Sequence, residues 1–125
     1  MTFSQLLHAV RQNPHAVVIP SVWGQGRAGF GGLAVALVFE AMRAKVPAGR
    51  PVRSLAVTFV GPLTLDAPVS FEAEVLREGK AVSQVLGRAV QNGQVVTLVQ
   101  GSFGAARASA LDVPALPAPA MKPVA

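Results

Sequence analysis

Three glycines, Gly24, Gly26 and Gly29, form the pattern G-x-G-x-x-G directly before an apolar segment of helical length. In dinucleotide-binding proteins this pattern makes the turn between a strand and a helix, where backbone N–H groups hold a pyrophosphate. Such a site also needs a second parallel strand ending in an acidic residue about twenty positions further on. Here that position falls in the basic region from Lys45 to Arg50, and hairpin-like segments follow it. The sequence therefore speaks against a dinucleotide site.

A second pair of glycines, Gly31 and Gly32, stands at the start of the same apolar segment. The first N–H groups of a helix have no partner within it, and the helix dipole is positive at this end. A carbonyl oxygen can approach such groups closely where glycine leaves out the side chain. The pair can thus polarise the carbonyl group of a bound ligand, or it can serve only to let the helix pack against a sheet. The sequence leaves both interpretations open.

The charge balance is basic, with 11 Lys plus Arg against 6 Asp plus Glu and a net charge of +5. Nucleic acid, an anionic membrane or an anionic small molecule would each suit such a balance. The one local cluster, from Arg43 to Arg53, contains no aromatic residue on which a base could stack, which speaks against nucleic acid. With no cysteine and two histidines, we predict no metal site and no bound cofactor.

The sequence also shows no signal for membrane insertion or export. The longest apolar run, Leu33 to Phe39, is far shorter than a membrane span. The first residues, MTFSQLLHAVRQN, lack the basic and apolar regions of a signal peptide. We therefore expect a cytoplasmic protein with no membrane partner.

The periodicity predicts helices first and strands afterwards. We expect a short amphipathic helix over 3–12, a strand over 15–20 and one long, largely buried helix over 31–45. Four strand-like segments follow, at 51–60, 68–77, 80–90 and 94–103, and Asn92-Gly93 between the last two is a strong hairpin signal. This order predicts an α+β fold in which a four-strand antiparallel meander wraps around one central helix, the hotdog arrangement.

The end of the chain is rich in proline, with Pro114, Pro117, Pro119 and Pro123. Such a segment neither continues a helix nor pairs in a sheet. We predict a single hotdog domain over 1–107 and a tail or linker over 108–125.

Several motifs resemble the N-terminal hotdog domain of type II acyl-CoA thioesterases, the TesB-like group. In chain order they are WGQGR at 23–27, FGG at 30–32, RSL at 53–55, FVGP at 59–62, REGK at 77–80, QNG at 91–93 and SFG at 102–104. The resemblance covers about residues 17–107. It implies acyl-CoA as ligand, thioester hydrolysis as reaction, and a homodimer or pairing with a second hotdog domain. Because members of this group usually carry two hotdogs joined by a linker, it also implies that this chain corresponds to the first half.

The resemblance suggests a set of substrate-binding residues. Aromatic side chains between helix and sheet would line an acyl groove, unless they are ordinary core, and arginines would meet the coenzyme A phosphates, unless they are solvated surface residues. The predicted substrate-binding residues are Trp23, Arg27, Phe30, Gly31, Gly32, Phe39, Arg53 and Phe59.

The chain departs from the pattern of the family that it resembles at the position of the catalytic acid. Related hotdog thioesterases carry Asp or Glu on the helix, nine positions after the residue that precedes the Gly-Gly pair, and here that residue is Phe39. The neighbouring Glu40 is the candidate: buried and unpaired it could act as a base, whereas paired with Arg43 at i+3 it would be structural. In double-hotdog members the resemblance places the acid, with its Gln and Thr or Ser helpers, on the second hotdog.

Three functions thus remain in view. The first is an acyl-CoA hydrolase or the N-terminal half of one. The second, favoured by Phe39, is a non-catalytic hotdog that binds acyl-CoA or serves as a scaffold. The third is a basic nucleic-acid-binding module.

Overall fold

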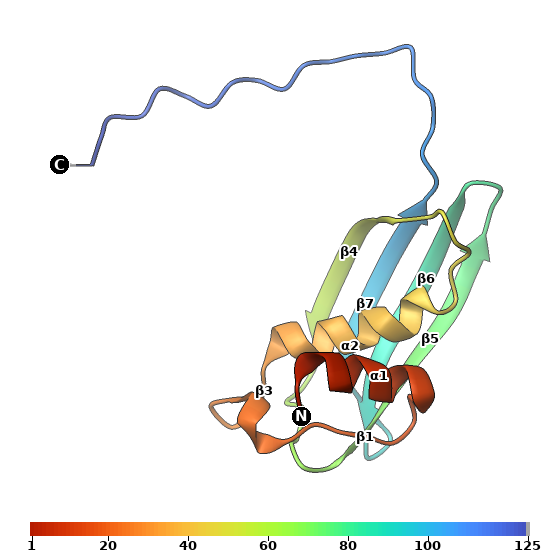
Figure 1. Ribbon diagram of the computed structural model, residues 1–125, viewed down its shortest axis with the longest axis vertical. Helices are drawn as coiled ribbons and strands as arrows, with labels where there is room; N and C mark the ends of the chain where they lie inside the picture. The colour runs from red at the N-terminus through yellow and green to blue at the C-terminus, as the bar shows by residue number, and fades with distance from the viewer. Residues whose placement is uncertain (125) are drawn as a thin grey trace.

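The computed structural model describes residues 1–124, and Figure 1 shows one antiparallel sheet with two helices on a single face. The elements in chain order are α1 (Phe3–Gln12), β1 (Val17–Val18), a 3₁₀ turn (Ser21–Trp23), β2 (Gly24–Gln25), β3 (Ala28–Gly29), α2 (Gly31–Arg43), β4 (Val52–Phe59), β5 (Pro68–Glu78), β6 (Val82–Gln91) and β7 (Gln94–Gly104). The predicted α+β class, a sheet around one long helix, is confirmed.

Both predicted helices are present. α1 spans 3–12 as expected, and it begins with a capping box in which Thr2 accepts from the N–H of Gln5 and the Gln5 side chain accepts from the N–H of Thr2. α2 ends at Arg43, two residues before the predicted end at 45. The strand expected over 15–20 is reduced to Val17–Val18, which pairs with the start of β5 at the edge of the sheet.

The predicted four-strand meander is wrong in one respect. The strand order is β1-β5-β6-β7-β4, so that only β5, β6 and β7 follow one another as hairpins, while β4 pairs with β7 at the far edge. The connection over 60–67 carries the chain from the edge strand β4 across the sheet to β5, and buried Leu63 anchors it. The Asn92-Gly93 hairpin is confirmed: both residues have positive φ, 50° and 72°, as a type I′ turn requires.

The glycines of the G-x-G-x-x-G pattern build a small hairpin. Gly24 pairs with Gly29 across β2 and β3, and Gly26 makes the turn with φ of 67°. A side chain on Gly24 or Gly29 would meet Leu65 or Leu63 at about 3 Å, so these two glycines allow close packing on the chain that follows β4. α2 then begins directly after this hairpin (Figure 1).

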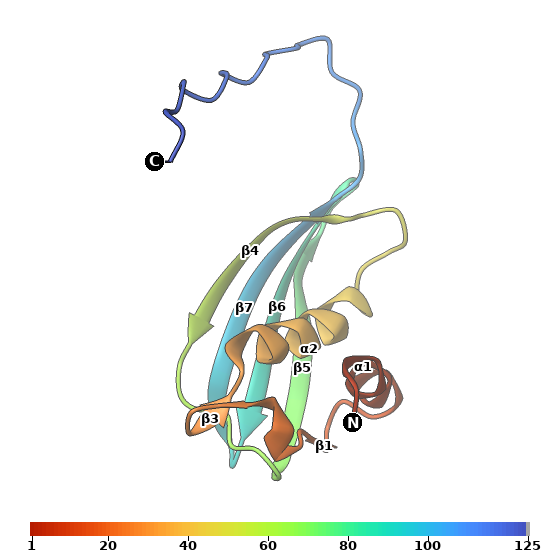
Figure 2. The ribbon, with the colours of Figure 1, turned by 60° about the vertical axis from the view of Figure 1, so that its left-hand side comes forward.

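Contact between α2 and the sheet depends on two other glycines. Gly87 of β6 and Gly101 of β7 face the helix, and Met42 of α2 fills the space above both. A Cβ on Gly87 would lie 2.5 Å from Met42 and 2.6 Å from Val38, both of which are fully buried. The helix can therefore lie close against the concave face of the sheet, as Figure 2 shows.

The segment after β7 runs away from the sheet (Figure 1). Residues 106–124 are exposed and form neither helix nor strand. The last backbone hydrogen bond to the sheet region joins the N–H of Ala105 to the carbonyl of Ala81. The boundary at residue 107 remains a prediction, and Ala125, the last residue of the predicted tail, lies outside the described residues.

The close approach of Met42 and Val38 to Gly87 leads to a prediction about stability. We expect Gly87→Ala to lower the free energy of unfolding by about 1–3 kcal/mol, because the added methyl group would overlap with Met42 and Val38 in a packed core. Gly61→Ala is the matched control, since a Cβ there meets no atom within 4 Å. Urea unfolding of both variants measures the difference, and equal stabilities would contradict the proposed close packing.

Candidate functional site

The N-terminus of α2 presents two backbone N–H groups that the protein itself does not use. Leu33 and Ala34 donate to the carbonyl of Phe30, which closes the first turn. The helix has no side-chain cap, and within residues 1–124 neither Gly31 nor Gly32 donates a hydrogen bond. Two free donors at the positive end of a helix can hold a carbonyl oxygen or a developing oxyanion.

Two aromatic rings flank these glycines. A Cβ on Gly31 would lie 2.9 Å from the ring of Phe59, and one on Gly32 would lie 2.8 Å from the ring of Phe30. Both rings are well exposed, Phe30 by 47% and Phe59 by 62%. The two glycines thus let aromatic side chains approach the helix end and form an apolar, open surround for its N–H groups.

Trp23 belongs to the same neighbourhood but has a supporting position. Its carbonyl accepts from the N–H of Phe30 at 2.9 Å, and its indole N–H donates to the carbonyl of Met1 at 3.1 Å. The ring is half-buried against the core. Five of the predicted residues therefore lie together at the start of α2: Trp23, Phe30, Gly31, Gly32 and Phe59.

Beside this helix end lies an uncovered part of the sheet. Leu55, Val57 and Phe59 of β4 pair with residues of β7 that face the helix side, yet their exposed fractions range from 38% to 62%. α2 lies over β5, β6 and β7, and β4 extends beyond it as the edge strand (Figure 2). The candidate site therefore opens onto an apolar strip and an unpaired strand edge.

Phe39 lies further along the same helix. Its spacing of seven residues from Gly32 places both on one face of α2. The half-buried Phe39 ring stacks on Phe103 of β7, with centroids 5.8 Å apart. The position at which the resemblance implies an acid is thus occupied here by an apolar contact with the sheet.

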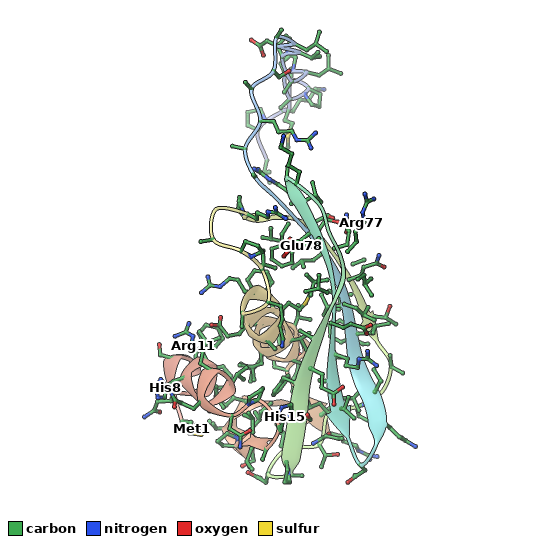
Figure 3. All side chains as sticks on the ribbon, turned by 90° about the vertical axis from the view of Figure 1, so that its right-hand side faces the viewer. Met1, His8, Arg11, His15, Arg77 and Glu78 are labelled. Atoms are coloured by element: carbon green, nitrogen blue, oxygen red, sulfur yellow. The ribbon has the colours of Figure 1, made fainter. Side chains whose placement is uncertain are left out.

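Glu40 points to a different part of the molecule. It is 9% exposed, and its carboxylate accepts from Nε of Arg11, on α1, at 2.5 Å, with Arg43 at 3.9 Å. It lines a hollow of about 300 Å³ between α1, α2 and β5, far along α2 from the Gly31 end. Figure 3 shows Arg11 on α1, on the helix side of the sheet. Glu40 is buried, as a catalytic base would need, but it is paired.

The predicted arginines do not meet within one chain. Arg27 is exposed in the turn between β2 and β3, near the start of α2. Arg53 lies at the opposite end of β4, where its Nε donates to the carbonyl of Gly104 at 3.1 Å. Any joint contact of both side chains with one ligand would need a second chain or domain.

Two features of the site are not evident from the sequence. The Arg11–Glu40 pair joins residues 29 positions apart, and no local sequence pattern predicts it. The uncovered strip did have a signal, since Leu55, Val57 and Phe59 alternate with Ser54, Ala56 and Thr58, but the alternation does not say which face remains open.

The residues that the structure describes, 1–124, also bear on membrane and metal binding. No helix among them is both long and apolar enough to cross a membrane. No group of three or more His, Asp or Glu side chains in this part of the chain is arranged to hold a metal ion.

Comparison with solved structures gives consistent matches. The chain is 26% identical to the acyl-CoA thioesterase II TesB2 of Mycobacterium marinum, with a TM-score of 0.64, over 73% of this chain and 36% of that one. A hot dog fold protein of unknown function from Alicyclobacillus acidocaldarius is 27% identical, with a TM-score of 0.60, over 78% and 38%. The chain thus spans little more than a third of the length of either. The tesB protein of Mycobacterium avium subs paratuberculosis, at 22% identity and a TM-score of 0.65, shares the fold over 95% of this chain and 50% of that one.

A search of curated protein sequences gives no match. The sequence profile of one family, described as the acyl-CoA thioesterase N-terminal domain, matches residues 19–104, which include the α2 N-terminus and all of β4 to β7. The hotdog fold and the TesB-like resemblance are therefore confirmed, and the chain belongs to the acyl-CoA thioesterase N-terminal domain family.

Proposed function

We propose that this chain binds the thioester group of an acyl-CoA at the N-terminus of α2 and contributes to its hydrolysis as one hotdog domain of a pair. The observation that carries this proposal is the pair of free N–H groups at Gly31 and Gly32, held between the exposed rings of Phe30 and Phe59. The N–H groups would stabilise the negative charge that develops on the carbonyl oxygen. The rings and the apolar strip of β4 would receive the acyl chain.

Pairing with a second hotdog domain is part of the proposal. β4 has an open hydrogen-bonding edge, and its side chains on the helix side are exposed although they are apolar. Both features are liabilities in water, and one partner sheet aligned along β4 would cover both. The partner is either a second copy of this chain or a second hotdog domain to which the proline-rich segment would lead. A cytoplasmic location also remains part of the proposal.

The acid that activates water is proposed to come from that partner. Phe39 occupies the helix position where related enzymes carry an acid, and Glu40 is bound to Arg11 on the other side of α2. With this arrangement the chain alone would bind acyl-CoA and turn it over poorly. The specific alternative, a complete enzyme with Glu40 as base, needs Arg11 to release the carboxylate.

A second candidate function is a non-catalytic acyl-CoA-binding domain. It rests on the same α2 N-terminus and on Phe39, and it differs only in lacking a catalytic partner. Hydrolysis assays over several acyl-CoA lengths, with the chain alone and with its partner domain, distinguish the two functions.

The role of the Gly31 N–H group can be tested by removing it alone. Proline is favoured at the first position of a helix. The ψ of 123° at Phe30 is outside the α region, which proline disfavours in the residue before it. We expect Gly31→Pro to slow hydrolysis by about 10²-fold if this N–H stabilises the oxyanion. Gly31→Ala is the control, because it adds a Cβ and keeps the N–H. Equal rates for the two variants would refute this role.

Glu40 is tested with stability and turnover together. If Glu40 is structural, Glu40→Gln and Arg11→Gln should each lower the free energy of unfolding by about 1–2 kcal/mol, since Arg11 is half-exposed and its pairing is screened by water. Hydrolysis should then stay close to the wild-type rate. If Glu40→Gln abolishes turnover while Arg11→Gln retains or raises it, Glu40 is the base.

The β4 edge is tested by placing a charge on it. We expect Val57→Asp to weaken self-association by at least about ten-fold, because the carboxylate would be buried against apolar groups of the partner. Leu76→Asp, on β5, is the control, since Leu76 is 49% exposed and far from β4. Sedimentation velocity over a range of concentrations measures the change. A wild-type chain that remains monomeric would leave only a separate hotdog domain as the partner.

A further inference from the structure

Three cations surround the turn between β5 and β6. Arg77 lies near the end of β5, Lys80 lies within the turn, and Arg107 follows β7. None of the three forms an ion pair within residues 1–124. A hollow of about 240 Å³, here named the turn hollow, is lined by Arg77, Gly79, Lys80, Ala81, Val82, Gln84 and Arg107.

No acidic residue is among those that line the turn hollow. Glu78 pairs in register with the buried Ser83, on the helix side of the sheet, whereas Arg77 pairs with Gln84 on the opposite face. Figure 3 shows Arg77 at the upper end of the strands, on the side away from the helices. On that outer face Glu72 and Glu74 lie against Arg88, at 3.9 and 3.2 Å. Among residues 1–124, no acidic side chain therefore forms an ion pair with the cations of the hollow.

The backbone around the turn hollow is held in place from behind. The guanidinium of Arg50 donates to the carbonyls of Gly79 and Lys80, at 2.8 and 2.9 Å, and to Ser83 Oγ at 2.9 Å. Arg50 thus binds the carbonyl oxygens that would otherwise repel an anion, and it adds positive charge beneath the turn. These hydrogen bonds tie the backbone of the turn to Arg50.

Two further contacts assemble its walls. The N–H of Ala105 donates to the carbonyl of Ala81 at 2.9 Å, which brings the chain leading to Arg107 next to the turn. Oε1 of Gln84 accepts from Ser102 Oγ at 2.7 Å, so that the amide nitrogen of Gln84 is the group left to donate. The hollow therefore combines two arginines, one lysine and an oriented amide donor.

We propose that the turn hollow binds a phosphate or pyrophosphate group of a small molecule. Two guanidinium groups can each hold phosphate oxygens in pairs, and the lysine and amide can supply further donors. The hollow lies on the outer face at the Arg53 end of β4. Gly31 meets Phe59 at the other end of this strand, about 20 Å from Arg53 at the usual rise per residue. The proposal is therefore independent of the proposed thioester site.

The structure favours a small molecule over a nucleic acid. The hollow is small, and the phenylalanines with the most exposed rings, Phe30 and Phe59, lie at the opposite end of the sheet. A strand of nucleic acid would need a row of cations and rings on which bases stack. Phosphate groups of a free nucleotide-like compound or of coenzyme A share the chemistry that the hollow offers.

The test is titration of the full chain with inorganic pyrophosphate, followed by NMR of backbone amides and of the Gln84 side-chain amide, with calorimetry for the affinity. We expect saturable shifts at Gly79, Lys80 and Gln84. Arg77→Gln/Lys80→Gln should weaken binding by about ten-fold or more, since each lost charge-assisted contact is strong. Lys45→Gln/Lys122→Gln removes the same charge elsewhere and is expected to retain the wild-type affinity.

Titrations with other ligands identify the compound that supplies the phosphate group. Coenzyme A that shifts the same amides and competes with pyrophosphate supports the proposal and identifies its phosphates as the ligand group. Shifts by pyrophosphate alone support it with a different phosphate compound as ligand. Equal weakening in both double variants, unsaturable binding, or tighter binding of short single-stranded DNA that salt abolishes in all variants would overturn it.

Discussion

The close contact between α2 and the sheet is the constraint on which the rest of the structure depends. Met42 and Val38 occupy the space that side chains at Gly87 and Gly101 would otherwise fill, so that the helix axis lies near the backbone of β6 and β7. Burial of both side chains is complete, so that their apolar surface is fully removed from water. Because the sheet curves around this contact, the position of α2 decides which strands it covers and which it leaves open.

The uncovered strip of β4 follows directly from that position. A helix centred over the strands from β5 to β7 cannot also cover an edge strand beyond them, and Leu55, Val57 and Phe59 therefore remain exposed. The free N–H groups of Gly31 and Gly32 open onto the same side, next to Phe59. Whatever covers β4 would then also enclose the start of α2. Association and ligand binding are therefore expected to be linked in this molecule.

Local signals in the sequence were sufficient to predict most helices, strands and turns, but not how these elements are arranged. The helix at 3–12, the start of the helix at Gly31 and the Asn92-Gly93 turn follow from caps, periodicity and turn chemistry, which act between near neighbours. The place of β4 beside β7 depends on a crossing connection between strands, and no short-range pattern encodes it.

The candidate site also has parts that the sequence predicts and parts that it does not. The Gly31–Gly32 pair could be predicted because a helix start is a local feature. The meeting of Gly31 with Phe59 was predictable only through the family resemblance, since Phe59 lies 28 positions further along the chain. The partner of Glu40 could not be predicted, because the local candidate Arg43 lies at 3.9 Å while the closer Arg11 comes from another helix. Long-range ion pairs leave no periodic trace.

The stacking of Phe39 on Phe103 also bears on where an acid can lie. Phe103 is almost completely buried beneath the Phe39 ring, and a carboxylate in place of that ring would lose the stacking contact and bring a charge against an apolar surface. Such a charge is tolerated only where a partner or water reaches it. In this chain the helix face that follows Gly32 is instead adapted to packing on β7. A hydrolase built on this domain would therefore gain its acid more readily from the surface that covers β4 than from α2 itself.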